Sequence, residues 1–167
     1  STWRLVVLDT MDISKHPECT LPVEAADFLA QHPADEFPQM GLGRGYANGG
    51  MGKVQVEWLK ATLNESDLAG ERVLVAMHHP AVEGVALTSH LLWNHEEVSS
   101  ILTSSASVVA VFNGHYHPGG YCCHRDTYFV GFEGIVETQG EANNAYAQVI
   151  LTQEHIEILG QGVTACR

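Results

Sequence analysis

The sequence predicts an α/β fold that passes into a sandwich of two β-sheets. Two continuous apolar runs, residues 73–77 and 108–112, are typical of buried strands. Segments with helical spacing of apolar residues precede and separate these runs. The last third of the chain contains only strand-like segments. Alternating strands and helices followed by consecutive strands indicate an α/β sheet that packs on a second sheet and is flanked by helices.

The chain begins with a strand and then becomes irregular. Residues 3–8 (WRLVVL) form a continuous apolar run, which predicts a buried strand. Residues 15–50 contain several prolines and a glycine-rich stretch, so we expect loops there, except for a short helix at 23–31.

The next element is predicted to be a helix over residues 52–63. Its apolar face is expected to consist of Val54, Trp58, Leu59 and Ala61. We expect the polar sequence Asn64-Glu65-Ser66 to end this helix, before the buried strand at 73–77.

The remaining elements lie on either side of the second buried strand. Residues 96–102 have apolar side chains at i, i+3 and i+4, which predicts a helix before the strand at 108–112. Three later strands are expected, at residues 128–132, 145–151 and 154–159.

Composition limits the classes of function. The 167 residues suffice for one domain or a large part of one, and 45% of them are hydrophobic. The net charge of −12 disfavours nucleic acid and anionic membranes as partners. An acidic chain also suits phosphate chemistry poorly unless divalent cations are bound.

The sequence carries weak signals about location. No apolar run is long enough to span a membrane. The four cysteines follow no disulfide framework, and no signal-peptide pattern is present, so we expect reduced thiols and a cytoplasmic protein. Because the chain starts without methionine and runs directly into a strand, we expect the natural chain to begin upstream.

Histidines follow both buried strands at the point where each strand ends. His78 comes directly after the first, and His115 and His117 come after the second. Carboxyl ends of strands in an open α/β sheet are where such folds place their sites, and neutral imidazole is the commonest metal ligand. Side chains at i and i+2 of an extended segment project to the same side. We therefore predict that these histidines bind one metal ion or two adjacent ions, whereas the side chain of His79 should point elsewhere.

A glycine-rich turn precedes the predicted helix at 52–63. Backbone amides of Asn48-Gly49-Gly50, with Gly52, could bind an anion together with the helix N-terminus. The alternative is a turn that only starts the helix.

Two other groups of residues deserve comparison with the histidines. Cys122, Cys123 and His124 form a poor zinc module, because adjacent cysteines on a strand point to opposite sides. Glu133 or Glu137 could bring a carboxylate near the site, although exposed acids at a strand end are the simpler interpretation.

Several stretches together resemble a known family. "VAMHHP" and "NGHYHPGGY" resemble the C-terminal motifs of the calcineurin-like metallophosphoesterase superfamily. The match narrows to the manganese-dependent ADP-ribose/CDP-alcohol diphosphatase branch with the stretches "RLVVLDTMDIS", "ANGGMGKVQVEWL", "LLWNHEEV" and "FEGIVET". The resemblance covers nearly all of residues 3–162. It implies that residues 1–167 are the C-terminal part of a single metallophosphoesterase domain, half of a two-sheet β-sandwich flanked by helices.

The resemblance also implies a metal centre. His78 and His115 would bind one divalent ion and His117 the other, with manganese expected and iron or zinc as alternatives. The family's remaining ligands lie in D-x-H, G-D-x-x-D and G-N-H motifs of an N-terminal part that is absent from this sequence. That part is expected either upstream in the same chain or on a separate chain.

The implied reaction is hydrolysis of the diphosphate bond of ADP-ribose, CDP-alcohols or similar small nucleoside-diphosphate compounds by a metal-bridging hydroxide. No residue of this chain is then catalytic beyond the metal ligands. Tyr46, Asn48, Gly49 and Gly50 would face the nucleotide side of the substrate. The family often has an aromatic residue directly before the asparagine, where this chain has Ala47, and this departure bears on base stacking.

Two functions remain open on the sequence. The first is a dinuclear phosphohydrolase that is competent only with the absent N-terminal part. The second is a catalytically inactive split or degenerate phosphoesterase that serves as a structural subunit of a larger assembly. In either case, a half-domain should expose one face of its sheet.

Overall fold

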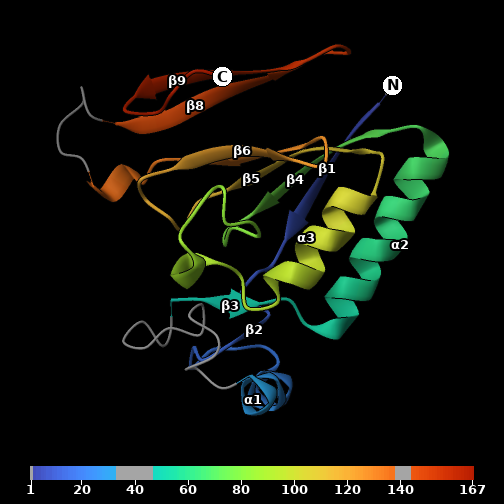
Figure 1. Cartoon of the computed structure of the whole chain (residues 1–167), viewed down its shortest axis with the longest axis vertical. Helices are drawn as coiled ribbons and strands as arrows, with labels where there is room; N and C mark the ends of the chain where they lie inside the picture. Colours follow the sequence, from blue (N-terminus) through green and yellow to red (C-terminus); the bar gives the residue numbers. More distant parts are fainter. Residues whose placement is uncertain (1, 33–46, 138–143) are drawn as a thin grey trace.

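The main feature of the computed structural model, which describes residues 2–32, 47–137 and 144–167, is a mixed β-sheet (Figure 1). In this described part, the sheet has five strands in the order β1-β4-β5-β7-β6. Their bounds are β1 Trp3–Leu8, β4 Arg72–Met77, β5 Val108–Asn113, β7 Thr127–Gly131 and β6 Gly120–His124. The first four are parallel, and β6 runs antiparallel to β7 at one edge.

The two faces of this sheet are covered differently. Helices α2 (Lys53–Ala69) and α3 (His95–Ser104) lie on one face, and the hairpin of β8 (Ala145–Leu151) and β9 (Ile156–Gly162) lies on the other side (Figure 1). The prediction of an α/β fold with helices and a second β-layer is confirmed.

The hairpin is attached to the sheet through its turn. The guanidinium of Arg72 donates to the carbonyls of Thr152 and Gln153 at 3.1 and 2.6 Å. The indole N–H of Trp3 donates to the same Thr152 carbonyl at 2.9 Å. The start of β1 and β4 therefore holds the β8–β9 turn in place.

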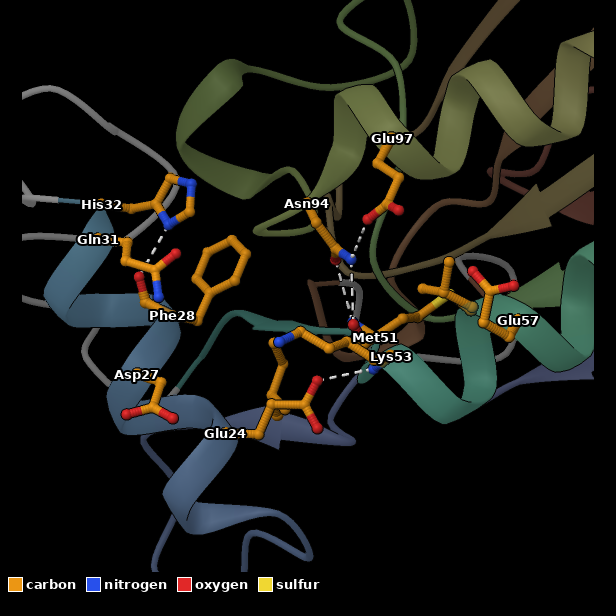
Figure 2. Close-up of a pocket in the computed structure, with 12 residues that line it drawn as sticks. Glu24, Asp27, Phe28, Gln31, His32, Met51, Lys53, Glu57, Asn94 and Glu97 are labelled. Carbon is orange, nitrogen blue, oxygen red and sulfur yellow. Dashed lines mark hydrogen bonds between the residues drawn. The ribbon is translucent and has the colours of Figure 1, made fainter.

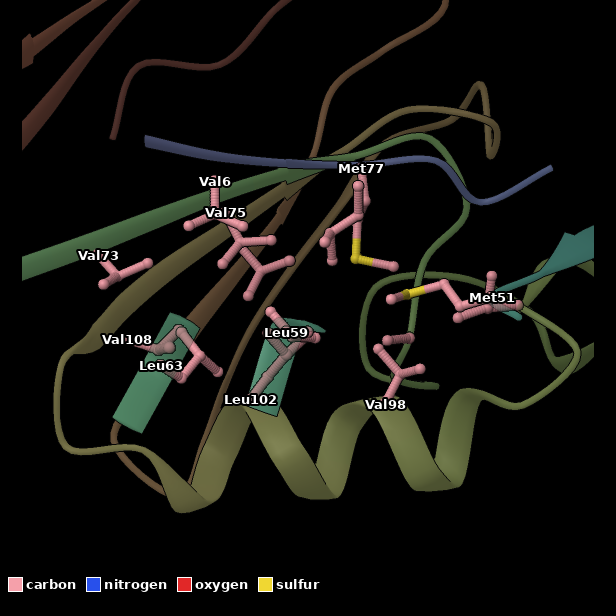
Figure 3. Close-up of a cluster of buried hydrophobic side chains, with 14 of the residues drawn as sticks. Val6, Met51, Leu59, Leu63, Val73, Val75, Met77, Val98, Leu102 and Val108 are labelled. Atoms are coloured by element: carbon pink, nitrogen blue, oxygen red, sulfur yellow. The ribbon is translucent and has the colours of Figure 1, made fainter. Parts of the chain in front are cut away.

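The hydrophobic core lies between the sheet and the two helices. Figure 3 shows strand residues such as Val75 and Met77 pointing toward Leu59 of α2 and Leu102 of α3. Leu59 and Leu102 are both 0% exposed. Burying a leucine fully contributes about 1.5–3 kcal/mol, so this layer fixes the strand ends on which the histidines sit.

Smaller elements close the edge of the fold near the end of β1. Helix α1 (Pro22–Gln31) packs against the short strand β2 (Ile13–Ser14), which pairs with β3 (Gly49–Gly50). Short 3₁₀ turns lie at Thr88–His90 and Ile135–Glu137.

Helix α2 differs from its prediction in length and in orientation. Asn64-Glu65-Ser66 does not end it, because Asn64 and Glu65 lie on its exposed side, and the helix continues to Ala69. It stops at Gly70, whose φ of 63° is the left-handed conformation that favours glycine at a helix end.

The buried face of α2 is also rotated from the predicted one. Val54 and Trp58 are 80% and 48% exposed. Of the predicted face only Leu59 is buried, and it lies with Val56, Leu63 and Ser66 on the buried side of the helix. Four apolar residues close together gave the wrong face, since the true face repeats over the full length of the longer helix.

Three other features bear on the predictions. Strand β6 was not predicted, and the last strand lies at Ile156–Gly162 rather than 154–159. All four cysteines are free thiols. Among the described residues, no helix combines the length and the apolar character needed to cross a bilayer.

Candidate metal centre

The parallel pairing of β4 and β5 brings two of the predicted ligands together. Because Ala76 pairs with Phe112, both strands end at the same edge of the sheet. His78 follows β4 and His115 follows β5, and their ring centroids are 5.0 Å apart. Nδ1 of His115 lies 3.2 Å from Nε2 of His78. The predicted convergence of His78 and His115 is therefore present in the fold.

The loop after β5 is tied to the end of β4 by its backbone. The amide of Gly114 donates to the carbonyl of His78 at 3.1 Å. The next residue, His115, has φ of 63°, a left-handed conformation that is uncommon for a residue with a side chain. Such conformations persist only where the surrounding contacts hold them, and they concentrate at functional sites.

His79 also lies in this cluster, contrary to the expectation that it points elsewhere. Among the described residues, the ring nitrogens of His78, His79 and His115 form a group within 4.8 Å of one another. The His79 ring is 4.3 Å from that of His115 and is 0% exposed. Its two nitrogens are already engaged, Nδ1 with the hydroxyl of Thr10 and Nε2 with the carbonyl of Ala47, each at 2.8 Å.

His117 occupies a different position from the other predicted ligands. It is not part of the group of three histidines within the described part of the chain. Its side chain is 43% exposed, and Nδ1 lies 2.5 Å from a carboxylate oxygen of Glu137. Of the two acids proposed from the sequence, Glu137 thus contacts a predicted ligand, while Glu133 packs beside Gly119. A ligand histidine often has its second nitrogen bound to a carboxylate in this way.

The cluster holds its imidazoles neutral. Burial, and after it the proximity of His79 and His78, together lower the pKa of His115 to about 3. Burial likewise lowers the pKa of His79 to about 4, and it lowers the pKa of His78. The neutral ring is the form that binds metal, so His78 and His115 are ready for binding at neutral pH without losing a proton.

Asn48 is engaged with the histidines rather than open to solvent. It is 3% exposed, and its Oδ1 lies 2.7 Å from Nε2 of His115. Its Nδ2 donates to the carbonyls of Ser89 and Leu91 at 2.8 and 3.4 Å. The sequence pointed to Asn48 but gave no sign of this contact, because its partner lies 67 positions away.

The amides at the start of α2 are bound by the protein's own carboxylates. The amide of Gly52 donates to Asp12 at 3.0 Å. The amide of Lys53 donates to Glu24 at 2.7 Å (Figure 2). Gly49 and Gly50 form β3 and pair with β2. The Gly52 amide and the start of α2 are thus engaged within the protein. Substrate binding by Asn48, Gly49 and Gly50 stays a prediction. Tyr46 lies outside the described residues.

The pocket beside the start of α2 is acidic (Figure 2). It has a volume of about 260 Å³. Its lining includes the carboxylates Glu24, Asp27, Glu57 and Glu97. This charge opposes binding of a diphosphate, and no histidine of the cluster lines the pocket.

The donor set at the sheet edge fits part of a metal site. Two nitrogens bound to one ion at about 2.0–2.1 Å lie about 2.8–3.4 Å apart, from neighbouring octahedral to tetrahedral positions. The 3.2 Å separation of His115 Nδ1 and His78 Nε2 falls in this range. Among the described residues, the cluster offers three imidazoles and no carboxylate.

Comparison with known proteins finds similarity to a group of diphosphatases. No family model matches it. It is 32% identical over 172 residues to the manganese-dependent ADP-ribose/CDP-alcohol diphosphatase of Danio rerio, covering 96% of this chain and 53% of that protein. It is 35% identical over 131 residues to the protein of the same name in Arabidopsis thaliana, covering 71% of this chain and 42% of that protein.

The fold of the chain is also similar to that of a solved structure. The crystal structure of a dimetal phosphatase from Danio rerio superposes with a TM-score of 0.86 at 31% identity. The superposition covers 99% of this chain and 56% of the other. The chain therefore spans about half the length of this structure and of the Danio rerio relative.

Proposed function

The chain is homologous to the manganese-dependent ADP-ribose/CDP-alcohol diphosphatases over about half of their length, and from this premise we propose that it supplies the histidine side of a dinuclear phosphohydrolase centre. The proposed reaction is hydrolysis of the diphosphate bond of ADP-ribose, a CDP-alcohol or a similar nucleoside-diphosphate compound. The observation that carries the proposal is the 3.2 Å approach of His115 Nδ1 and His78 Nε2 at the ends of β5 and β4.

His78 and His115 would hold one ion, and His117 would hold the second. Pairing of His117 Nδ1 with Glu137 leaves Nε2 as the nitrogen that would face an ion. Two divalent ions, manganese or alternatively iron or zinc, supply an activated water and neutralise charge on the phosphoryl oxygens when bound. The residues of this chain hold and orient the ions, and none of them needs to transfer a proton.

Completion of the site requires further ligands, which we assign to an N-terminal part of the same domain. Residues 1–167 would then be the C-terminal part. The β1 edge of the sheet is suited to pairing with a strand of that N-terminal part. Leu5 and Val7 are 63% and 66% exposed, and among the described strands only β4 pairs with β1. An uncovered apolar strand at a sheet edge is a typical pairing surface.

A second candidate is a subunit without turnover. The absence of carboxylates from the histidine cluster, within the described residues, favours it. In this case the β1 edge would still bind its partner, but the histidines would hold no ions.

The test uses the natural protein that contains these residues, together with any upstream segment or partner chain. Manganese content is measured by mass spectrometry, and hydrolysis of ADP-ribose and of a CDP-alcohol is measured separately. His115→Ala should lose bound metal and lower kcat by about 100-fold or more, because charge stabilisation worth several kcal/mol is removed.

The matched control is His124→Ala. His124 is an exposed histidine on β6, and its removal should change neither metal content nor turnover. Metal-free natural protein without hydrolysis would support the structural subunit. Loss of metal in the His124→Ala variant would contradict the assignment of ligands.

A further inference from the structure

A series of hydrogen bonds connects Thr10, His79, the Ala47–Asn48 segment and His115. We propose that His79 and Asn48 are positioning residues, which together hold the His115 imidazole in the Nε2–H tautomer with Nδ1 directed at His78. The inference rests on the proposed metal role of His115, but the tautomer itself can be observed without metal or turnover.

The first step is the orientation of the Asn48 amide. Its Nδ2 donates to the carbonyls of Ser89 and Leu91, so its Oδ1 must be the atom that faces His115. An amide oxygen only accepts hydrogen bonds. Nε2 of His115, at 2.7 Å, must therefore carry the proton.

The second step is the nitrogen that remains. A neutral imidazole has one N–H, so protonation of Nε2 leaves a lone pair on Nδ1 of His115. This atom lies 3.2 Å from Nε2 of His78. The lone pair that would bind an ion thus faces the neighbouring ligand. The opposite tautomer would direct an N–H at the same place and would repel a cation.

The third step explains what holds Asn48 in place. The carbonyl of Ala47 only accepts, so Nε2 of the neutral His79 ring carries the proton, and Nδ1 accepts from the hydroxyl of Thr10 at 2.8 Å. The oxygen of this hydroxyl also accepts from the amide of His79 at 3.2 Å. Nε2–H of His79 then donates to the carbonyl of Ala47 at 2.8 Å. Ala47 directly precedes Asn48, so the bond fixes the segment from which the amide projects.

His79 also supports the ligand rings by direct contact. Its ring packs edge-on against those of His78 and His115, with centroids 4.8 and 4.3 Å away. Because both of its nitrogens are engaged within the protein, His79 itself does not bind the ion. In the cluster, His79 therefore acts through packing against the rings of His78 and His115.

Nitrogen NMR tests the tautomer directly. In the metal-free natural protein labelled with ¹⁵N-histidine at pH 7.5, ring correlations assigned by their loss in His115→Gln should show Nε2–H at His115. Asn48→Leu keeps the volume and removes the acceptor, so the spectrum should move toward Nδ1–H. An Nδ1–H ring in the wild type, or an unchanged spectrum in Asn48→Leu, overturns the inference.

Manganese affinity tests the role of His79. Removing a hydrogen-bonding partner of a ligand usually weakens metal binding about 10–100-fold, and Asn48 is that partner of His115. In calorimetric titrations of the natural protein with Mn²⁺, Asn48→Leu should show this loss, and His79→Leu, which acts through Ala47, should weaken binding by up to about 10-fold. His79→Gln, which can still donate to the Ala47 carbonyl, should recover most of the affinity. His124→Gln serves as the unaffected control.

Two results separate this inference from the proposed function. Equal affinity in the wild type, His79→Leu and His79→Gln would overturn the positioning role while leaving the metal centre intact. Nε2–H at His115 in a wild-type protein that binds no manganese would support the positioning geometry and overturn the proposed function. If His79→Leu does not fold, the spectra of the wild type and of Asn48→Leu still decide whether His115 is held in the Nε2–H tautomer.

Discussion

Burial of a neutral histidine makes the stability of this fold depend on pH. His79 is 0% exposed, and burial lowers its pKa to about 4, whereas a histidine in an unfolded chain has a pKa of about 6.5. As the pH falls below 6.5, the unfolded chain binds a proton that the folded chain does not. The contribution of His79 to stability is therefore complete above pH 6.5 and is lost as the pH falls toward 4.

The size of the effect follows from these two pKa values. Between pH 7.5 and pH 5, proton binding to the unfolded state lowers the free energy of unfolding by about 2 kcal/mol through His79 alone. His79→Gln removes this titration and keeps an N–H donor for Ala47. The difference in unfolding free energy between wild type and variant should thus change by about 2 kcal/mol over this range, in favour of the variant at low pH.

Urea unfolding followed by tryptophan fluorescence at pH 7.5, 6.5 and 5 measures this difference. His78 and His115 titrate in both proteins, so their contributions largely cancel. His124→Gln, at an exposed position, should show the pH dependence of the wild type. The difference in unfolding free energy between the wild type and His79→Gln could instead stay constant within about 0.5 kcal/mol from pH 7.5 to pH 5. That result would refute the argument that His79 is buried in its neutral form in the folded protein.

Three further predictions concern the scaffold of the site. Leu59→Ala should lower the unfolding free energy measured in urea by about 2–5 kcal/mol, because Leu59 is 0% exposed. Leu68→Ala, at a residue that is 82% exposed, should change it by less than about 0.5 kcal/mol. Similar losses in the two variants would contradict the assigned buried face of α2. Gly70→Ala should cost about 1–2 kcal/mol in thermal melts, because φ at Gly70 is 63°; an unchanged melting temperature would argue against this helix end. Arg72→Gln should speed hydrogen exchange in the β8–β9 hairpin, since the contacts of Arg72 with two carbonyls at the hairpin turn are lost; unaltered exchange would show that the hairpin is held elsewhere.

The sheet could be predicted from local signals. β1 matches its predicted bounds, and β4 and β5 differ by one residue at an end. Buried parallel strands are continuous apolar runs, so each is readable without knowledge of its neighbours. The rule that their carboxyl ends meet at one edge then predicted the approach of His78 and His115.

The supporting contacts could not be predicted in the same way. His79 directly follows the predicted ligand His78. Because successive side chains of a strand point to opposite sides, His79 was expected to point away from the other histidines. The chain leaves β4 at Met77, however, so that alternation no longer applies. The contact between Asn48 and His115 depends on how β3 is placed beside the sheet, which tertiary packing decides. The end of α2 was predicted wrongly because the polar residues Asn64 and Glu65 lie on the exposed side of the helix, where they do not interrupt it.

The left-handed backbone of His115 has a consequence for the loop that follows β5. For a residue with a side chain this conformation costs about 1–2 kcal/mol, and here it falls on the residue whose nitrogen faces His78. Contacts that hold Nδ1 of His115 close to His78 also keep the backbone of His115 in the left-handed conformation. By thermodynamic reciprocity, a filled centre should rigidify the turn, and an empty one should let it sample other conformations. We expect this loop to be the part of the molecule whose dynamics report occupancy.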